Sequence, residues 1–127
     1  MAKKKILIVD DEPDILRLAS LRLKKLGYDV IMAIDEKEAL DAIRSEKPDL
    51  VLLDLFLPVM NGTDVCKKTK NDERLKHIPI ILFTAHSDFM TAERAKKFGA
   101  DDYVVKPFDS EELVDKIEDV LAQGANL

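Results

Sequence analysis

The chain has 127 residues, a length that fits one domain, and 46% of them are hydrophobic, which is enough for a packed core and disfavours intrinsic disorder. Charged residues make up 35% of the chain and the net charge is -5, which disfavours a protein whose main role is direct binding of nucleic acid. No apolar run approaches the roughly 20 residues that cross a bilayer, and the single cysteine, Cys66, is predicted to be a buried or half-buried thiol rather than part of a disulfide. These features are typical of one cytoplasmic domain, over residues 1–127, that does not enter a membrane.

The first half of the chain alternates between apolar runs typical of strands and patterns typical of helices. Pro13 suits the first turn of a helix, and Gly27 suits a left-handed cap at its end. Asp35 and Glu38 have the spacing of a capping box. In chain order, the sequence predicts a strand at residues 5–9, a helix from Pro13 to Leu26, a strand at residues 28–33, a helix that Asp35 opens and that runs through Ile43, and a strand at residues 50–53.

The second half continues the alternation. Gly99 is a candidate helix cap, and Asp109 with Glu112 has the spacing of a second capping box. The predicted elements are a weak helix around Val65 and Cys66, a strand at residues 80–83, a helix at about residues 88–98, a short strand at residues 103–105 and a last helix whose apolar stripe contains Leu113, Ile117, Val120 and Leu121. The end of the chain is expected to fray from Gln123.

Five strands that alternate with five helices predict an α/β fold with a parallel sheet and helices on both faces. The expected architecture is a flavodoxin-like doubly wound (βα)5 three-layer sandwich with strand order 2-1-3-4-5. In that order the first and third strands are neighbours. The sequence therefore predicts that Asp10 and Asp11 lie beside Asp54.

Polar or charged residues stand at the carboxyl ends of the four strands that adjoin the predicted switch point of the sheet. Such ends meet at one edge of a parallel sheet, where ligands bind. The residues are Asp10, Asp11 and Glu12 after the first strand, Asp54 after the third, Thr84 after the fourth and Lys106 after the fifth. Each alone has an ordinary explanation as a helix cap, a turn residue or a solvated lysine, but together they predict a site.

Clustered carboxylates repel one another, and a divalent cation relieves that repulsion. Oxygen ligands without nearby His or Cys favour Mg²⁺, for which Mn²⁺ could substitute, over zinc. Such a site suits a phosphoryl group at Asp54, because an ionised carboxylate is a nucleophile toward phosphorus. The Lys106 ammonium and the Thr84 hydroxyl can then stabilise charge on the phosphoryl oxygens.

Two other functions are open on the same fold. A nucleotide or flavin carrier is disfavoured, because Asp10-Asp11-Glu12 follows the first strand where such a carrier needs glycines, Ser or Thr to cradle a phosphate. An interaction module that works without phosphorylation is disfavoured because the whole set of strand-end residues is present.

The chain also resembles a known family over residues 4–122. The matching motifs are Ile8-Val9-Asp10-Asp11-Glu12, the run from Asp54 to Gly62, Thr84-Ala85 and the run from Gly99 to Phe108. They are similar to the motifs of receiver domains from bacterial two-component response regulators.

The resemblance implies that Asp54 is the phosphoacceptor and that Thr84 and Lys106 assist it. It implies Thr84 and Tyr103 as switch residues, with Tyr103 turning inward when Thr84 moves toward the phosphoryl group. The implied metal ligands are the carboxylates of Asp10, Asp11 and Asp54 and the backbone carbonyl of Phe56, with Asp11 as the direct ligand.

Two residues beside the implied site suggest how long a phosphoryl group would last there. Phe56 stands two positions after Asp54, and His86 stands two after Thr84. We expect the bulky Phe56 to obstruct the water that hydrolyses the phosphate. His86 has two interpretations: the favoured one is an exposed loop histidine, and the other is a residue that orients a water and so opposes Phe56. The resemblance also implies a cis peptide between Lys106 and Pro107.

The implied role is regulatory, with no enzymatic activity beyond the domain's own phosphorylation and dephosphorylation. The donor would be a phosphohistidine on a sensor histidine kinase or a histidine phosphotransfer protein, and the receiver of the signal a downstream protein or an output domain. The chain would be either a stand-alone regulator or a receiver cut from a longer protein. A monomer or a phosphorylation-dependent dimer is expected, without direct contact to nucleic acid or membrane.

Overall fold

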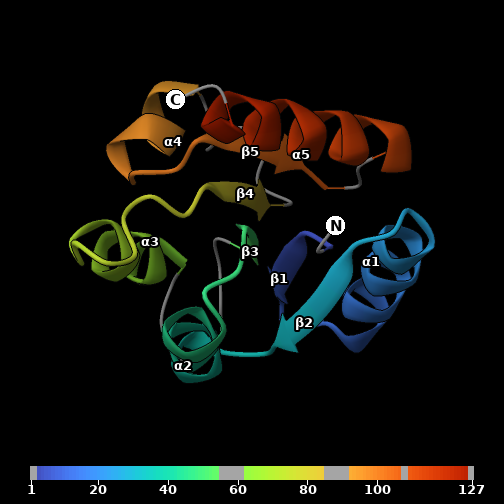
Figure 1. The fold of residues 1–127 in the computed structure, drawn as a ribbon, viewed down its shortest axis with the longest axis horizontal. Helices are drawn as coiled ribbons and strands as arrows, with labels where there is room; N and C mark the ends of the chain where they lie inside the picture. Colours follow the sequence, from blue (N-terminus) through green and yellow to red (C-terminus); the bar gives the residue numbers. More distant parts are fainter. Residues whose placement is uncertain (1–2, 55–61, 85–91, 107–108, 126–127) are drawn as a thin grey trace.

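The computed structural model describes residues 3–54, 62–84, 92–106 and 109–125, and within them five strands alternate with five helices (Figure 1). In chain order these are β1 (Lys5–Val9), α1 (Pro13–Lys25), β2 (Asp29–Ala33), α2 (Glu36–Glu46), β3 (Leu50–Asp54), α3 (Gly62–Lys70), β4 (Ile80–Thr84), α4 (Ala92–Lys97), β5 (Asp102–Val105) and α5 (Ser110–Ala125).

The strands form one parallel sheet in the order β2-β1-β3-β4-β5, which confirms the predicted doubly wound fold. Helices α1 and α5 pack on one face of the sheet, and α2, α3 and α4 pack on the other (Figure 1). Strands β1 and β3 pair directly, with Val9 opposite Leu53. The residues that follow these two strands therefore emerge side by side, although more than forty residues separate them in the chain.

Alternating side chains of the sheet fill two separate cores. Leu7 and Val9 of β1 belong to the core under α2, α3 and α4, whereas Ile6 and Ile8 belong to the core under α1 and α5. All residues of β3 and β4 are buried, as expected for central strands of a parallel sheet. This double burial explains why both strands read as continuous apolar runs in the sequence.

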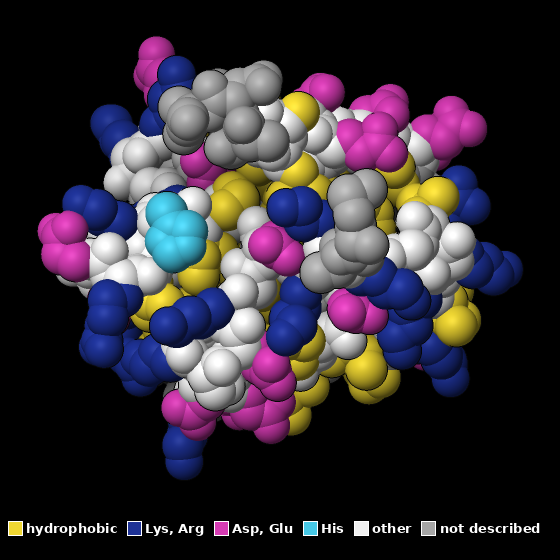
Figure 2. Space-filling view, viewed as in Figure 1, with side chains coloured by type: hydrophobic (Ala, Val, Ile, Leu, Met, Phe, Trp, Pro, Cys, Tyr) yellow, Lys and Arg dark blue, Asp and Glu magenta, His cyan; other side chains and the backbone are white. Residues whose placement is uncertain are grey.

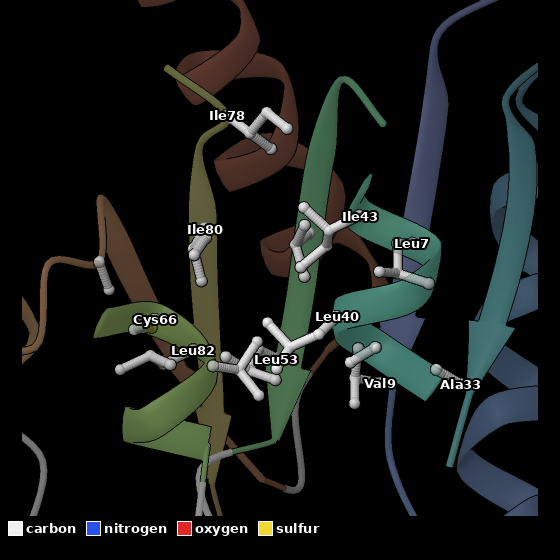
Figure 3. Close-up of a cluster of buried hydrophobic side chains, with 14 of the residues drawn as sticks. Leu7, Val9, Ala33, Leu40, Ile43, Leu53, Cys66, Ile78, Ile80 and Leu82 are labelled. Atoms are coloured by element: carbon white, nitrogen blue, oxygen red, sulfur yellow. The ribbon is translucent and has the colours of Figure 1, made fainter. Parts of the chain in front are cut away.

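The core on the α2 and α3 side contains the only cysteine of the chain (Figure 3). Cys66 is fully buried and belongs to the same core as Leu40, Ile43 and Leu82, which agrees with the predicted buried or half-buried thiol. Burial raises the pKa of the Cys66 thiol to about 12, because the apolar surroundings disfavour the thiolate. The thiol is therefore protonated at neutral pH and packs as a small apolar group.

Most predicted helix ends are confirmed, with differences in detail. Gly27 has a φ of +95°, and the Asp35 carboxylate accepts the Glu38 backbone N–H at 2.8 Å. The Glu38 carboxylate, however, accepts from Ile34 rather than from Asp35. Lys47, which no pattern singled out, adopts a left-handed conformation with a φ of 46° at the end of α2.

Two predicted boundaries in the second half need separate comment. Helix α5 continues to Ala125, so the expectation that the chain frays from Gln123 was wrong. Gln123 is exposed and continues the helix by backbone hydrogen bonds rather than by packing. The predicted start of a helix near residue 88 lies outside the described residues, which resume at Ala92.

The surface carries charges of both signs, and Figure 2 shows Lys and Arg side chains both on the side where α1 lies and on the side where α3 lies. In the described part of the chain, the exposed large hydrophobic side chains lie on or next to α1 and β2: Leu18, Leu21, Leu26, Met32 and Ile34. None of the described helices is long and apolar enough to span a membrane.

We expect Leu52→Ala in β3 to lower the free energy of unfolding by about 3 kcal/mol, because Leu52 is 2% exposed and its loss leaves a cavity. Leu18→Ala is the matched control, because Leu18 is 68% exposed; its effect should stay within about 0.5 kcal/mol. Urea denaturation followed by circular dichroism measures both values. Equal losses in the two variants would contradict the burial assigned to β3.

Candidate functional site

The strand-end residues that the sequence singled out emerge at one edge of the sheet. Asp10 directly follows β1, Asp54 is the last residue of β3, Thr84 is the last residue of β4, and Lys106 directly follows β5. Pairing of the strands aligns these ends, with Asp54 opposite Phe83 and Thr84 opposite Val105.

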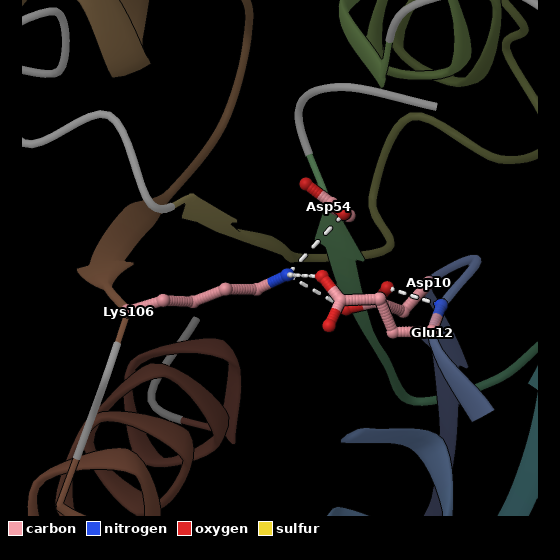
Figure 4. Close-up of polar contacts among 4 residues, drawn as sticks. All are labelled: Asp10, Glu12, Asp54 and Lys106. Atoms are coloured by element: carbon pink, nitrogen blue, oxygen red, sulfur yellow. Dashed lines mark hydrogen bonds and ion pairs between the residues drawn. The ribbon is translucent and has the colours of Figure 1, made fainter. Parts of the chain in front are cut away.

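The Lys106 ammonium connects this edge (Figure 4). Its Nζ donates to Asp10 Oδ2 at 2.8 Å and to Asp54 Oδ2 at 3.3 Å, across 96 and 52 residues of the chain. The three side chains are nearly enclosed, with exposed fractions of 10% for Lys106, 0% for Asp10 and 8% for Asp54. The structure thus brings together a lysine and two carboxylates away from bulk water, where charge interactions are strong.

The charge state of Lys106 follows from these contacts. Burial would by itself lower the pKa of the Lys106 ammonium, but hydrogen bonds to Asp10 and Asp54 and the negative charges of both carboxylates raise it above its ordinary value. Lys106 therefore carries its positive charge throughout the physiological pH range.

Asp10 is held by donors on both oxygens. Its Oδ1 accepts the Glu12 backbone N–H at 2.8 Å, and its Oδ2 accepts from Lys106. Its own backbone N–H donates to the Ala33 carbonyl at 3.1 Å, which ties the turn after β1 to the end of β2. The position of Asp10 is therefore fixed before helix α1 begins at Pro13.

Asp10, Asp11 and Glu12 form a compact group of carboxylates. Each has an oxygen within 4.8 Å of an oxygen of the other two, and Asp11 and Glu12 are exposed. Glu12 Oε1 also lies 4.0 Å from Lys106 Nζ. Sequence reasoning gave Glu12 no role of its own, although its place as the third acid of the run was the available signal.

The donor set of this group fits a hard divalent cation. Three carboxylates within a few ångströms, with no His or Cys among them, are the ligand type that Mg²⁺ or Mn²⁺ prefers. Asp54 is not a member of the group and reaches Asp10 through Lys106.

Thr84 and Tyr103 occupy the neighbouring part of the sheet. Thr84 is fully buried, and its carbonyl accepts the Lys106 backbone N–H at 2.7 Å. Tyr103 is half-buried on β5, with the Lys116 Nζ 5.6 Å from the centroid of its ring. Backbone hydrogen bonds between β4 and β5 therefore connect Thr84 to Lys106 and to the strand that carries Tyr103.

Three sequence-based expectations fall outside the described residues: the metal-binding carbonyl of Phe56, the effects of Phe56 and His86 on phosphoryl lifetime, and the cis peptide before Pro107.

The chain is similar in sequence to response regulators. The sequence profile of the response regulator receiver domain matches residues 6–118. The DNA-binding response regulator MtrA of Mycolicibacterium smegmatis is 42% identical over 115 residues, which cover 91% of this chain and 49% of MtrA. The alkaline phosphatase synthesis transcriptional regulatory protein PhoP of Bacillus subtilis is 41% identical over 121 residues, which cover 95% of this chain and 50% of PhoP. The chain thus spans about half the length of these curated relatives.

Solved structures agree with the sequence comparison. A CheY-like response regulator receiver domain protein from Methanospirillum hungatei is similar with a TM-score of 0.88 and 31% identity, covering 98% of each chain.

We expect Lys106→Met to lower the free energy of unfolding by about 3 kcal/mol without added divalent cation, because it leaves two buried carboxylates without their cation. Since the pKa of Lys106 is raised, its stabilising effect should be present below about pH 10.4 and be lost as the pH rises above the folded-state value.

Lys116→Met is the matched control. Lys116 pairs with Asp102 at 3.2 Å, but about 30% of each side chain is exposed, so the loss should stay below about 1 kcal/mol. Urea denaturation at pH 7 compares the two variants. A loss for Lys106→Met no larger than that for Lys116→Met would contradict the buried ion-pair arrangement.

Proposed function

Since this chain belongs to the response regulator receiver domain family, and so acts in two-component phosphorelay signalling, we propose that Asp54 is the residue that accepts the phosphoryl group. The donor is a phosphohistidine on a sensor histidine kinase or a histidine phosphotransfer protein. The observation that carries the proposal is the position of the Lys106 Nζ between the carboxylates of Asp10 and Asp54.

The chemistry requires little beyond positioning. An Asp54 carboxylate oxygen attacks the phosphorus and the phosphorus–nitrogen bond to the donor ring breaks. The ring, protonated on its other nitrogen, leaves with the bonding electron pair as neutral imidazole. Negative charge develops on the phosphoryl oxygens, and the Lys106 ammonium is close enough to Asp54 to stabilise it. The Thr84 hydroxyl is proposed to donate to another phosphoryl oxygen.

Asp10, Asp11 and Glu12 are proposed to hold Mg²⁺, which Mn²⁺ could replace. Both Asp10 oxygens already accept N–H donors whereas Asp11 is exposed, which supports Asp11 as the direct ligand. The Asp54 carboxylate and the Phe56 carbonyl complete the proposed set. A bound Mg²⁺ neutralises charge on phosphoryl oxygens, and the protein's part is to hold these oxygens in place.

The output is proposed to be a change at the Tyr103 surface. Phosphorylation adds charge that attracts Thr84 and Lys106, and both are joined to β5 through backbone pairing. Tyr103, with Lys116 above its ring, would report that shift to a partner, an output domain or a second copy. Residues 1–127 would act as a single receiver domain that catalyses only its own phosphorylation and dephosphorylation.

The first test is chemical. In Mg²⁺, acetyl phosphate should add one phosphoryl group to the protein and none to Asp54→Asn, which lacks the nucleophile. Asp14→Asn is the control, because the Asp14 side chain is 83% exposed on α1. Mass spectrometry of intact protein and peptides reads the result, and chelation of Mg²⁺ should slow the reaction at least tenfold. Equal modification of Asp54→Asn would remove Asp54 from its role.

The exposed leucines of α1 suggest where a protein donor docks. Helix α1 begins directly after the acidic group, and its outer side exposes 68% of Leu18 and 53% of Leu21. Exposed apolar side chains next to a reactive site are typical of a protein interface.

We expect Leu18→Glu to reduce phosphoryl transfer from a phosphorylated histidine kinase at least tenfold, because the charge would be buried against an apolar partner. The rate with acetyl phosphate should not change, since that donor needs no protein contact. The kinase used is one that phosphorylates the unaltered protein. An equal reduction with both donors would show that the substitution damages the site and would contradict a docking role.

A further inference from the structure

The aromatic ring of Phe83 is a further neighbour of the Lys106 ammonium, in addition to the nearby carboxylates. Lys106 Nζ lies over this ring, 4.6 Å from its centroid. Phe83 is 3% exposed, so the contact is shielded from water. No sequence motif drew attention to this residue, which reads as one more apolar position of a buried strand.

The register of the sheet holds the ring in this place. Phe83 on β4 is opposite Asp54 on β3 and opposite Val104 on β5. Its side chain points to the same face as Ile81 and Val104, toward the core under α1 and α5. The ring therefore lies between the strand that bears the proposed phosphoacceptor and the strand that leads to Lys106.

A ring face is a useful partner for this cation. The negative face of the ring attracts a desolvated ammonium, and this attraction does not require the ammonium to point along a single donor–acceptor direction. Hydrogen bonds from Lys106 to Asp54 must be exchanged when phosphoryl oxygens arrive, whereas the ring contact need not change. A lysine side chain has several freely rotating bonds, and the ring contact adds to the ion pair with Asp10 in restricting the ammonium during the exchange.

We propose that Phe83 is a positioning residue for phosphoryl transfer, whose ring holds the Lys106 ammonium while the lysine exchanges Asp54 for phosphoryl oxygens. The proposal rests on the proposed function of Asp54 and extends it to a residue that does not touch the phosphoryl group.

The test replaces Phe83 with phenylalanine analogues that carry one, two and three ring fluorines. These keep the shape of the side chain but progressively weaken the negative ring face. The rate of phosphorylation by acetyl phosphate in Mg²⁺ should fall with each fluorine, by about tenfold at three. A residue that only fills space would give the same rate throughout.

A spectroscopic measurement reports the contact itself. Ring current should shift the Lys106 ε-proton resonances upfield, in the unphosphorylated and in the phosphorylated protein. Phe83→Leu, a smaller apolar side chain without a ring, should return them to ordinary positions. Ordinary positions in the unaltered protein, in either state, would overturn the proposal.

The same fluorine series in Lys106→Met is the matched control. Without the cation, the residual phosphorylation rate should not depend on fluorination, and a persisting trend would overturn the role of the ring. If the protein is phosphorylated on Asp54 but its phosphorylation rate does not change with fluorination of Phe83, only the role of Phe83 is overturned. Absence of phosphorylation on Asp54 overturns the proposed function and this proposal with it.

Discussion

The structure depends on one buried charge arrangement, the Lys106 ammonium between the carboxylates of Asp10 and Asp54. Parallel pairing of β1 with β3 forces two acidic strand ends next to each other, and their repulsion must be offset. Lys106 offsets it because β5 ends at the same edge of the sheet. The order and the lengths of the strands must therefore bring Asp10, Asp54 and Lys106 to the same edge of the sheet, and this requirement fixes the position of the site.

Burial of these three charged groups opposes folding, but it strengthens the electrostatic interactions available for a reaction at Asp54. Taking three charged groups out of water requires close pairing, and the apolar strands around them supply the stability that the charges do not. The same enclosure strengthens the field that acts on a group arriving at Asp54. The acids Asp11 and Glu12 are exposed, which would give the proposed cation and phosphoryl group access.

Much of the fold could be predicted from sequence because its signals are local. The buried strands read as apolar runs, Pro13 and Gly27 mark the ends of α1, and alternation of strands and helices fixes the parallel sheet. The convergence of Asp10, Asp54 and Lys106 follows from strand order, which explains how residues so distant in the chain could be placed together.

The missed features depend on contacts between elements. Phe83 reads as an ordinary core residue until the register of β4 sets it beneath Lys106. Lys47 has no glycine-like signal, yet it ends α2 in a left-handed conformation. Glu12 was named from the sequence only as one of the acids after β1, and the turn held by Asp10 is what brings it into the carboxylate group. Phe83 and Lys47 have no pattern that a sequence could reveal.

The most direct measurement of the central claim is a crystal structure of the protein phosphorylated in Mg²⁺. The account predicts a phosphoryl group on Asp54 with the Lys106 Nζ within hydrogen-bond distance of one of its oxygens, and the metal beside Asp10 and Asp11. A phosphoryl group on another residue, or a Lys106 side chain directed into solvent, would contradict it.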